Sequence, residues 1–136
     1  MSKISLERFD HMVFTVRSID ATCAFYARVL GLTVRTYEFD GMKRTSLHFG
    51  EQKINLHEAG HEFEPKAHAP APGAIDICFI TSTPIDEVIA HLNGCGVVVA
   101  DGPGVRSGAL GKMRSVYFRD PDRNLIEVSN YAEADG

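Results

Sequence analysis

Several features that would direct the protein to a membrane or to nucleic acid are missing from the sequence. No segment approaches the roughly 20 consecutive apolar residues of a membrane-spanning helix, and the N-terminal MSKISLERFD lacks the apolar stretch of a signal peptide. Lys and Arg total 14 against 18 Asp and Glu, which gives a formal net charge of −4. Without a basic block, nucleic acid and anionic membranes are disfavoured as partners. We therefore expect a cytoplasmic protein.

Cysteine is scarce as well. Its three positions, Cys23, Cys78 and Cys95, are an odd number without ligand-like spacing. Each lies in an apolar segment, so we expect buried, reduced thiols. The 136 residues are 44% apolar and 24% charged, which is typical of a globular protein with one domain or two very small ones.

The chain contains an internal repeat. Residues 10–34, DHMVFTVRSIDATCAFYARVLGLTV, resemble residues 75–99, IDICFITSTPIDEVIAHLNGCGVVV. Further along, SLHFGEQKINLHE at 46–58 resembles SVYFRDPDRNLIEV at 115–128. Because the matches occur in the same order in both halves, we infer a duplication.

Each half has the pattern of a strand, a helix and three further strands. The expected strands are 10–16, 32–38, 44–49 and 53–58, then 75–80, 97–100, 114–118 and 124–129. The expected helix caps are Ser18 or Asp20 with Gly31 for the first helix, and Thr83-Pro84 with Gly94 or Gly96 for the second. The sequence thus predicts an α+β fold of tandem βαβββ modules in a single domain, 1–136. Module one covers 9–58, a connector covers 59–74, and module two covers 75–131.

Strand alternation then divides the side chains between two faces. The face packed on the helices is expected to carry Phe14, Leu56, Phe79 and Ile126. The opposite, concave face is expected to carry His11, His57, Asp76 and Glu127, and the repeat aligns His11 with Asp76 and His57 with Glu127. Imidazoles and carboxylates suit a divalent ion such as Ni, Zn, Mn or Fe(II). A structural histidine and solvated carboxylates are the alternative, but burying two carboxylates without a cation is costly.

Other residues are candidates for the substrate pocket. His48 and Tyr117 share the concave-side parity of the proposed ligands. The glycine-rich segment GPGVRSGALGKMR, residues 102–114, carries Arg106 and Arg114. We expect it to be either a flexible lid whose cations meet an anionic substrate, or a solvated loop.

These motifs resemble those of the vicinal oxygen chelate superfamily, which includes glyoxalase I, fosfomycin-resistance proteins and extradiol dioxygenases. Residues 10–34 are similar to its opening module, and GALGKMRSVYFRDPDRNLIEV to its closing strands. The likeness covers residues 9–131. Small virulence-protein-like or lactoylglutathione-lyase-like members also carry QKINLHE and FEPKA. One departure is Arg123, where a glycine commonly follows DPD; a nonglycine there disfavours a turn with positive φ.

The resemblance implies a site as well as a fold. Two modules would form a curved half-barrel around a metal, with the helices on its convex side, and in many small members the modules pair between the subunits of a homodimer. His11 matches the first-strand histidine and Glu127 the terminal glutamate ligand. Asn55 aligns with the first-module glutamate of glyoxalase I, although His57 is chemically the better ligand. Asp76 stands where a histidine is usual.

The reaction class also follows from the resemblance. We expect a lyase or isomerase that acts on a small α-oxygenated compound by metal polarisation of vicinal oxygens. Glu127 would be both a ligand and a candidate base, with a metal-bound water as the other candidate. Two alternatives stay open: an extradiol-type dioxygenase with Fe(II), and a metal-free protein that sequesters a small molecule.

Overall fold

Two similar halves build the protein. The computed structural model describes residues 3–131. The first half contains β1 (His11–Val16), α1 (Ile19–Leu30), β2 (Thr33–Phe39), β3 (Met42–Phe49) and β4 (Gln52–Glu58). The second half contains β5 (Asp76–Ile80), α2 (Ile85–Gly94), β6 (Val99–Gly108), β7 (Gly111–Arg119) and β8 (Leu125–Tyr131). The predicted α+β fold with tandem βαβββ order is confirmed.

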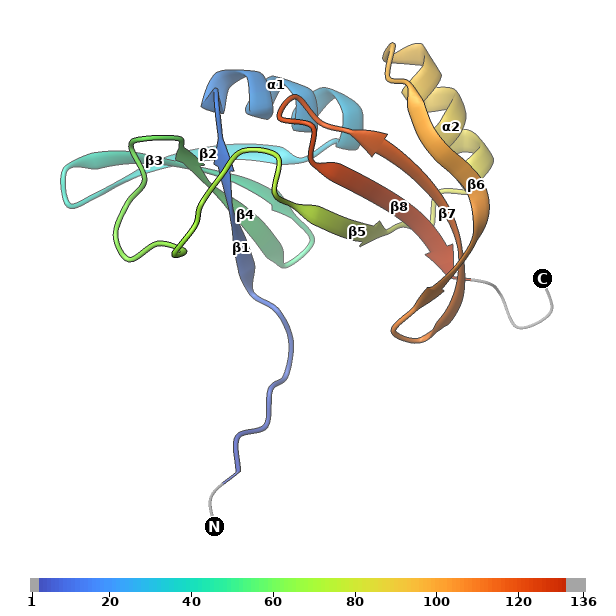
Figure 1. The fold of residues 1–136 in the computed structure, drawn as a ribbon, viewed down its shortest axis with the longest axis horizontal. Helices are drawn as coiled ribbons and strands as arrows, with labels where there is room; N and C mark the ends of the chain where they lie inside the picture. Colours follow the sequence, from blue (N-terminus) through green and yellow to red (C-terminus); the bar gives the residue numbers. More distant parts are fainter. Residues whose placement is uncertain (1–2, 132–136) are drawn as a thin grey trace.

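Each half forms its own four-stranded sheet, in the orders β1-β4-β3-β2 and β5-β8-β7-β6. The first strand of each half pairs in parallel with the last strand of that half, and all other pairs are antiparallel. Both helices lie on the same side of the sheets, as Figure 1 shows. The opposite side of each sheet is therefore not covered by a helix.

Local sequence signals place the two helices. The Ser18 Oγ accepts a hydrogen bond from the Ala21 N–H at 3.0 Å, and Gly31 ends α1 in the left-handed conformation with φ 69°. Helix α2 follows Pro84 without a side-chain cap, and Gly96 beyond it has φ 73°. Within residues 3–131, neither α1 nor α2 is long and apolar enough to cross a membrane.

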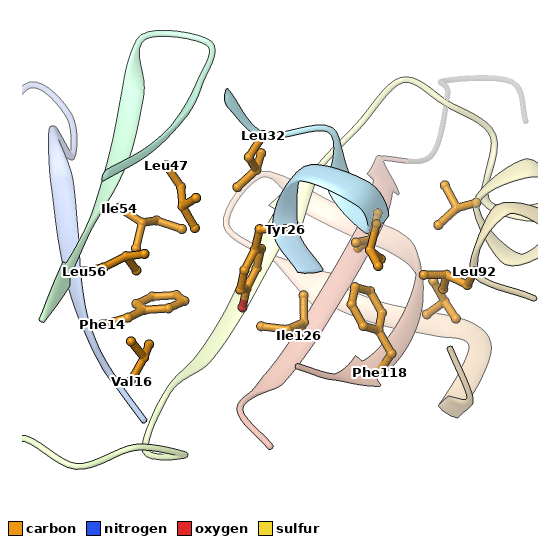
Figure 2. Packing of buried hydrophobic residues seen from close by; sticks show 14 of the residues in the cluster. Phe14, Val16, Tyr26, Leu32, Leu47, Ile54, Leu56, Leu92, Phe118 and Ile126 are labelled. Atoms are coloured by element: carbon orange, nitrogen blue, oxygen red, sulfur yellow. The ribbon is translucent and has the colours of Figure 1, made fainter. Parts of the chain in front are cut away.

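The apolar core joins the two halves. Tyr26 of α1 is fully buried between Phe14 and Leu56 of the first sheet and Ile126 of the second (Figure 2). The rings of Phe14 and Tyr26 meet edge to face with their centroids 6.2 Å apart. Burying one large apolar side chain contributes about 1.5–3 kcal/mol. One helix thus holds both sheets to a common core.

A polar anchor at the β7–β8 turn reinforces this join. The Tyr26 hydroxyl donates to Asp120 Oδ2 at 2.6 Å, and Asn124 Nδ2 donates to the same oxygen at 2.8 Å. Asp120 Oδ1 accepts from the backbone N–H groups of Asp122 and Asn124, each at 2.9 Å. These bonds hold the turn even though Arg123 has φ 70°. The turn that Arg123 was expected to disfavour therefore forms.

The glycine-rich segment 102–114 forms paired strands and is therefore neither of the two expected forms, a flexible lid or a solvated loop. Its residues form the β6–β7 hairpin, which pairs from Val99 to Gly108 with two register shifts on the way. At Gly102 a Cβ would lie 2.6 Å from the Ser115 carbonyl oxygen, so glycine is needed where the bulged strand approaches its neighbour. Strand pairing provides hydrogen-bond partners for the backbone N–H and C=O groups of this segment. In a flexible lid those groups would bind water instead.

The cysteines are free thiols, as predicted, but they are not buried as predicted. Cys78 is exposed, and Cys23 and Cys95 are half-buried. Cys78 alternates with the core-facing residues of β5, so it points to the side of the sheet away from the helices.

Candidate functional site

Strand register decides which side chains lie in the same row on the concave face. The cross-strand pairs are His11–Lys53, Val13–Asn55 and Thr15–His57 in the first sheet, and Asp76–Leu125, Cys78–Glu127 and Ile80–Ser129 in the second. When His11 is matched to Asp76, the next row contains Asn55 in module one and Glu127 in module two.

The sequence alignment of His57 with Glu127 is therefore wrong by one row. Sequence matching placed Leu56 on Ile126, whereas the register places Ile54 there. The mismatch begins in the preceding hairpins. Leu47 pairs with Ile54 and Phe118 pairs with Ile126, so Leu47 corresponds to Phe118. The bulged β6–β7 hairpin, 99–119, is longer than the β2–β3 hairpin, 33–49, and this extra length shifts the register. His57 corresponds instead to Ser129.

His11 is oriented by its sequence neighbour. Its Nδ1 lies 2.8 Å from Asp10 Oδ1, and because a carboxylate only accepts hydrogen bonds, Nδ1 is the donor. This hydrogen bond is the main reason that the pKa of Asp10 is lowered. Within residues 3–131, the other ring nitrogen of His11, Nε2, makes no hydrogen bond, and the side chain is exposed. A free Nε2 is available to a ligand.

Asn55 has an unsatisfied oxygen. Its Oδ1 is buried and has no hydrogen-bond partner among the described residues. A buried acceptor without a partner costs about 1–3 kcal/mol, so such an atom in a folded protein calls for a physical reason. An ion or a bound molecule on the concave face would supply one.

His57 lies deeper, under the connector. It is 7% exposed, and the Phe63 ring lies edge to face with the imidazole at 5.5 Å. Burial, followed by the nearby Arg44, lowers the pKa of His57. His57 also lines a cavity of about 460 Å³ that is closed on one side by connector residues such as Pro65 and Pro70.

Glu127 is half-buried in a polar network on the second sheet. The Ser129 hydroxyl donates to Glu127 Oε2 at 3.3 Å and lies 2.6 Å from the Ser115 hydroxyl. Burial raises the pKa of Tyr117, and the neighbouring Glu127 carboxylate raises it further. Cys78 pairs with Glu127 across the strands, and burial raises the pKa of its thiol. The carboxylate thus has one hydroxyl donor, Ser129, and a tyrosine on the neighbouring strand.

The remaining pocket candidates differ in position. Arg106 lies over the Tyr117 ring at 5.3 Å and pairs with Asp101 at 3.2 Å, on the concave side. Arg114 instead pairs with Asp86 of α2 at 3.0 Å, so it belongs to the helix side, and its assignment to the pocket is wrong. Strand parity explains this, because Arg114 lies on the same face of β7 as the core residues of that strand.

His48 lies on the concave face, as its parity predicted. Its Nε2 is 2.8 Å from the Ser46 hydroxyl. Burial lowers the pKa of His48, and the positive charges of Arg35 and Lys53 lower it further. Positive charge is therefore concentrated on this part of the first sheet.

One chain does not bring the four predicted metal ligands together. His11 and Asp76 line the same cleft of about 730 Å³ at the junction of β1 and β5, while His57 lines the separate cavity under the connector. Across residues 3–131, no three His, Cys, Asp or Glu side chains are grouped closely enough to hold a metal ion. The ligand rows of the two modules lie on separate sheets.

Several residues of the site were missed by sequence reasoning. Asp10 could have been identified from the sequence, because it directly precedes His11. Strand parity also places Arg35, Arg44 and Lys53 on the concave face, but only the strand register shows how close together they lie.

The fold and this face define the class of protein. Residues 8–128 match the family described as the Glyoxalase/Bleomycin resistance protein/Dioxygenase superfamily, and the chain belongs to it. The resemblance read from the sequence is thereby confirmed.

Individual relatives agree with this assignment. The chain is 49% identical to Virulence protein STM3117 of Salmonella typhimurium over 126 residues, 93% of this chain and 85% of that protein. The crystal structure of STM3117 matches with a TM-score of 0.90, over 95% of this chain and 100% of that one. Glyoxalase domain-containing protein RDO1 of Mycosarcoma maydis is 46% identical over 132 residues, 97% of this chain and 73% of RDO1. Lactoylglutathione lyase from Agrobacterium tumefaciens shares the fold, with 22% identity and a TM-score of 0.69 over 93% of this chain and 95% of that one.

Proposed function

We propose that the protein is a divalent-metal-dependent lyase or isomerase of the glyoxalase type that acts on a small α-oxygenated compound. The observation that carries this proposal is the Asp10–His11 pair. Asp10 accepts the Nδ1–H of His11 and leaves Nε2 free. Metal-ligating histidines characteristically donate their second ring nitrogen to a carboxylate in this way.

The residues present fit a metal ion. Asn55 Oδ1 is a buried oxygen without a partner among the described residues, and its row matches that of Glu127, so we propose Asn55 rather than His57 as the second ligand of module one. Asp76 and Glu127 would complete the set from module two. One imidazole and three oxygen ligands suit Mn, Fe(II), Ni or Zn.

We further propose that the site is shared between two copies of the chain. His11 and Asn55 of one copy would face Asp76 and Glu127 of the other. This arrangement is supported by the failure of one chain to group three such ligands within residues 3–131. In a two-fold symmetric homodimer, the exchange would create two equivalent sites.

The chemistry divides between the metal and the protein. A bound divalent ion supplies Lewis-acid stabilisation of negative charge on two neighbouring substrate oxygens. The Glu127 carboxylate would remove a proton from the carbon beside those oxygens. Ser129 donates a hydrogen bond to this carboxylate, and Tyr117 lies beside it on the neighbouring strand. The concave face provides the surface on which the substrate is positioned.

Metal uptake tests the ligand assignment. Metal-free protein is titrated with Mn, Ni, Zn and Fe(II) while thermal stability and bound metal are measured. An ion at 100 times its dissociation constant should add about 2.7 kcal/mol. His11→Ala and Glu127→Ala should abolish uptake, whereas His68→Ala, at an exposed connector histidine, should not. Stoichiometric metal in either ligand variant would refute the assignment.

Mixing the two inactive variants tests the sharing of the site. A heterodimer of His11→Ala and Glu127→Ala has one site with both defects and one intact site. After equimolar exchange, about a quarter of the wild-type metal content should return. If every site lay within one chain, mixing would restore nothing.

Reaction assays separate the alternatives. Methylglyoxal with glutathione tests the lyase, while a catechol with Fe(II) and oxygen tests an extradiol dioxygenase. Within residues 3–131, the candidate ligands of a single chain do not come together. This favours one further candidate, a metal-free protein that binds a small molecule. The absence of a stability shift with any of the four ions would support that candidate over the enzyme.

A further inference from the structure

Three cations from three neighbouring strands lie on the concave face of module one. Arg44 of β3 lies directly opposite Tyr37 of β2, and Arg35 precedes Tyr37 by two residues on the same face. Lys53 of β4 places its Nζ 5.5 Å from the centre of the Tyr37 ring. The two side chains therefore approach each other across β3. Lys53 thus approaches an exposed aromatic ring, and Arg35 and Arg44 lie on the same face of the two neighbouring strands.

These charges have no acidic partner in the described part of the chain. Across residues 3–131, no carboxylate oxygen lies within 4.0 Å of a charged nitrogen of Arg35, Arg44 or Lys53. By contrast, Arg106 and Arg114, the arginines of the glycine-rich hairpin, are paired with Asp101 and Asp86. Like charges on adjacent strands are destabilising, so the face gains stability when an anion binds.

Arg44 is held in place for such a role. Its guanidinium lies 3.8 Å from the centre of the Phe63 ring and 5.3 Å from that of Phe39. Its Nε is buried and has no hydrogen-bond partner among the described residues. Aromatic contacts on a guanidinium fix its plane. Its unused N–H donors are then arranged for the two oxygens of a carboxylate or phosphate group.

We propose that Arg35, Arg44 and Lys53 form a subsite for a carboxylate or phosphate group of the substrate. The substrate is then a small organic anion whose acidic group is separate from its vicinal oxygens. Lys53 pairs with His11 across the strands, so the subsite adjoins the proposed ligand row. This inference rests on the proposed function in one respect, namely that the concave face is the substrate cavity.

Anion binding to the metal-free protein tests the subsite. Succinate and inorganic phosphate are titrated separately at low ionic strength by calorimetry, with wild type, Arg35→Gln, Arg44→Gln and the matched control Lys43→Gln. Lys43 is exposed on β3 and lies on the opposite face from Arg44. Wild type and Lys43→Gln should bind one of the probes saturably. The Arg35 and Arg44 variants should bind it about tenfold or more weakly, because each loses a charge-assisted hydrogen bond.

The choice of probes and variants keeps each outcome informative. Tighter binding of succinate indicates a carboxylate substrate, and tighter binding of phosphate indicates a phosphorylated one. If Arg44→Gln fails to fold, the exposed Arg35 still provides the test. The absence of saturable binding in wild type, or equal weakening in Lys43→Gln, overturns the proposal.

Sedimentation and metal uptake separate an anion subsite from a role of the same cations in the dimer or the metal site. Sedimentation of each variant measures the strength of the dimer. A weaker dimer with unchanged anion affinity would mean that the cations pair with carboxylates of a second copy. That result would overturn the subsite. Metal uptake by Arg35→Gln should equal that of wild type. Loss of metal binding in all proteins alongside normal anion binding would reject the metal-dependent function and leave the subsite standing.

Discussion

Replacement of Tyr26 by phenylalanine removes a single atom from the contact between the two halves. The Tyr26 hydroxyl donates to Asp120 Oδ2 at 2.6 Å, and both residues are buried. The ring itself stays in place because its contacts with Phe14 and Phe25 do not involve the hydroxyl. Asp120 retains its three donors from Asp122 and Asn124.

The expected cost follows from the charge of the acceptor. A hydrogen bond to a charged group contributes about 1.5–3 kcal/mol, and the carboxylate that loses its donor here is buried. For a chain of this length, the melting temperature should fall by about 5–10 °C. Because α1 and the β7–β8 turn belong to different modules, the loss should appear in one cooperative transition.

Calorimetry and urea denaturation of wild type and Tyr26→Phe measure this change. Tyr37→Phe is the matched control, since Tyr37 is 42% exposed and its hydroxyl makes no hydrogen bond within residues 3–131. That control should change stability by less than about 0.5 kcal/mol. A Tyr26→Phe protein as stable as the control would refute the proposed anchor.

Two further predictions concern the turn and the histidines His57 and His48. Arg123→Gly should raise the free energy of unfolding by about 1 kcal/mol, because a nonglycine residue at φ 70° is strained; urea denaturation measures it, and a destabilised variant would contradict the strain. Stability should also fall as the pH drops below 6.5, the ordinary pKa of histidine. Burial lowers the pKa of His57 and His48 in the folded protein, so below that pH the unfolded chain binds more protons than the folded one. Above that pH this difference vanishes. In His57→Gln the loss should be smaller, and an unchanged pH profile in that variant would show that His57 does not contribute.

Part of the site could be read from the sequence because it depends on local rules. Alternation along β1 and β8 is enough to place His11 and Glu127 on the face away from the helices. The same parity excludes Arg114 from that face, although the glycine-rich composition of its segment suggested a lid. Where composition and parity disagreed, strand pairing followed parity.

Other parts depended on distances that no single strand encodes. The row that contains Glu127 is matched by Asn55 rather than His57 because the bulged β6–β7 hairpin is longer than the β2–β3 hairpin. Lys53 approaches Tyr37 only because the two side chains extend toward each other across an intervening strand. Pairing register and side-chain reach set these relations, and both emerge when the sheet assembles.

The sequence by itself determined the duplication, the order of elements and the face on which each strand residue lies, since period-two and helical periodicities are written in neighbouring residues. Only the tertiary structure decided which residues of different strands share a row, which cations of residues 3–131 lack acidic partners, and that the candidate ligands of one chain lie on two separate sheets. Those properties arise from packing between segments far apart in the chain, where no local pattern constrains distance.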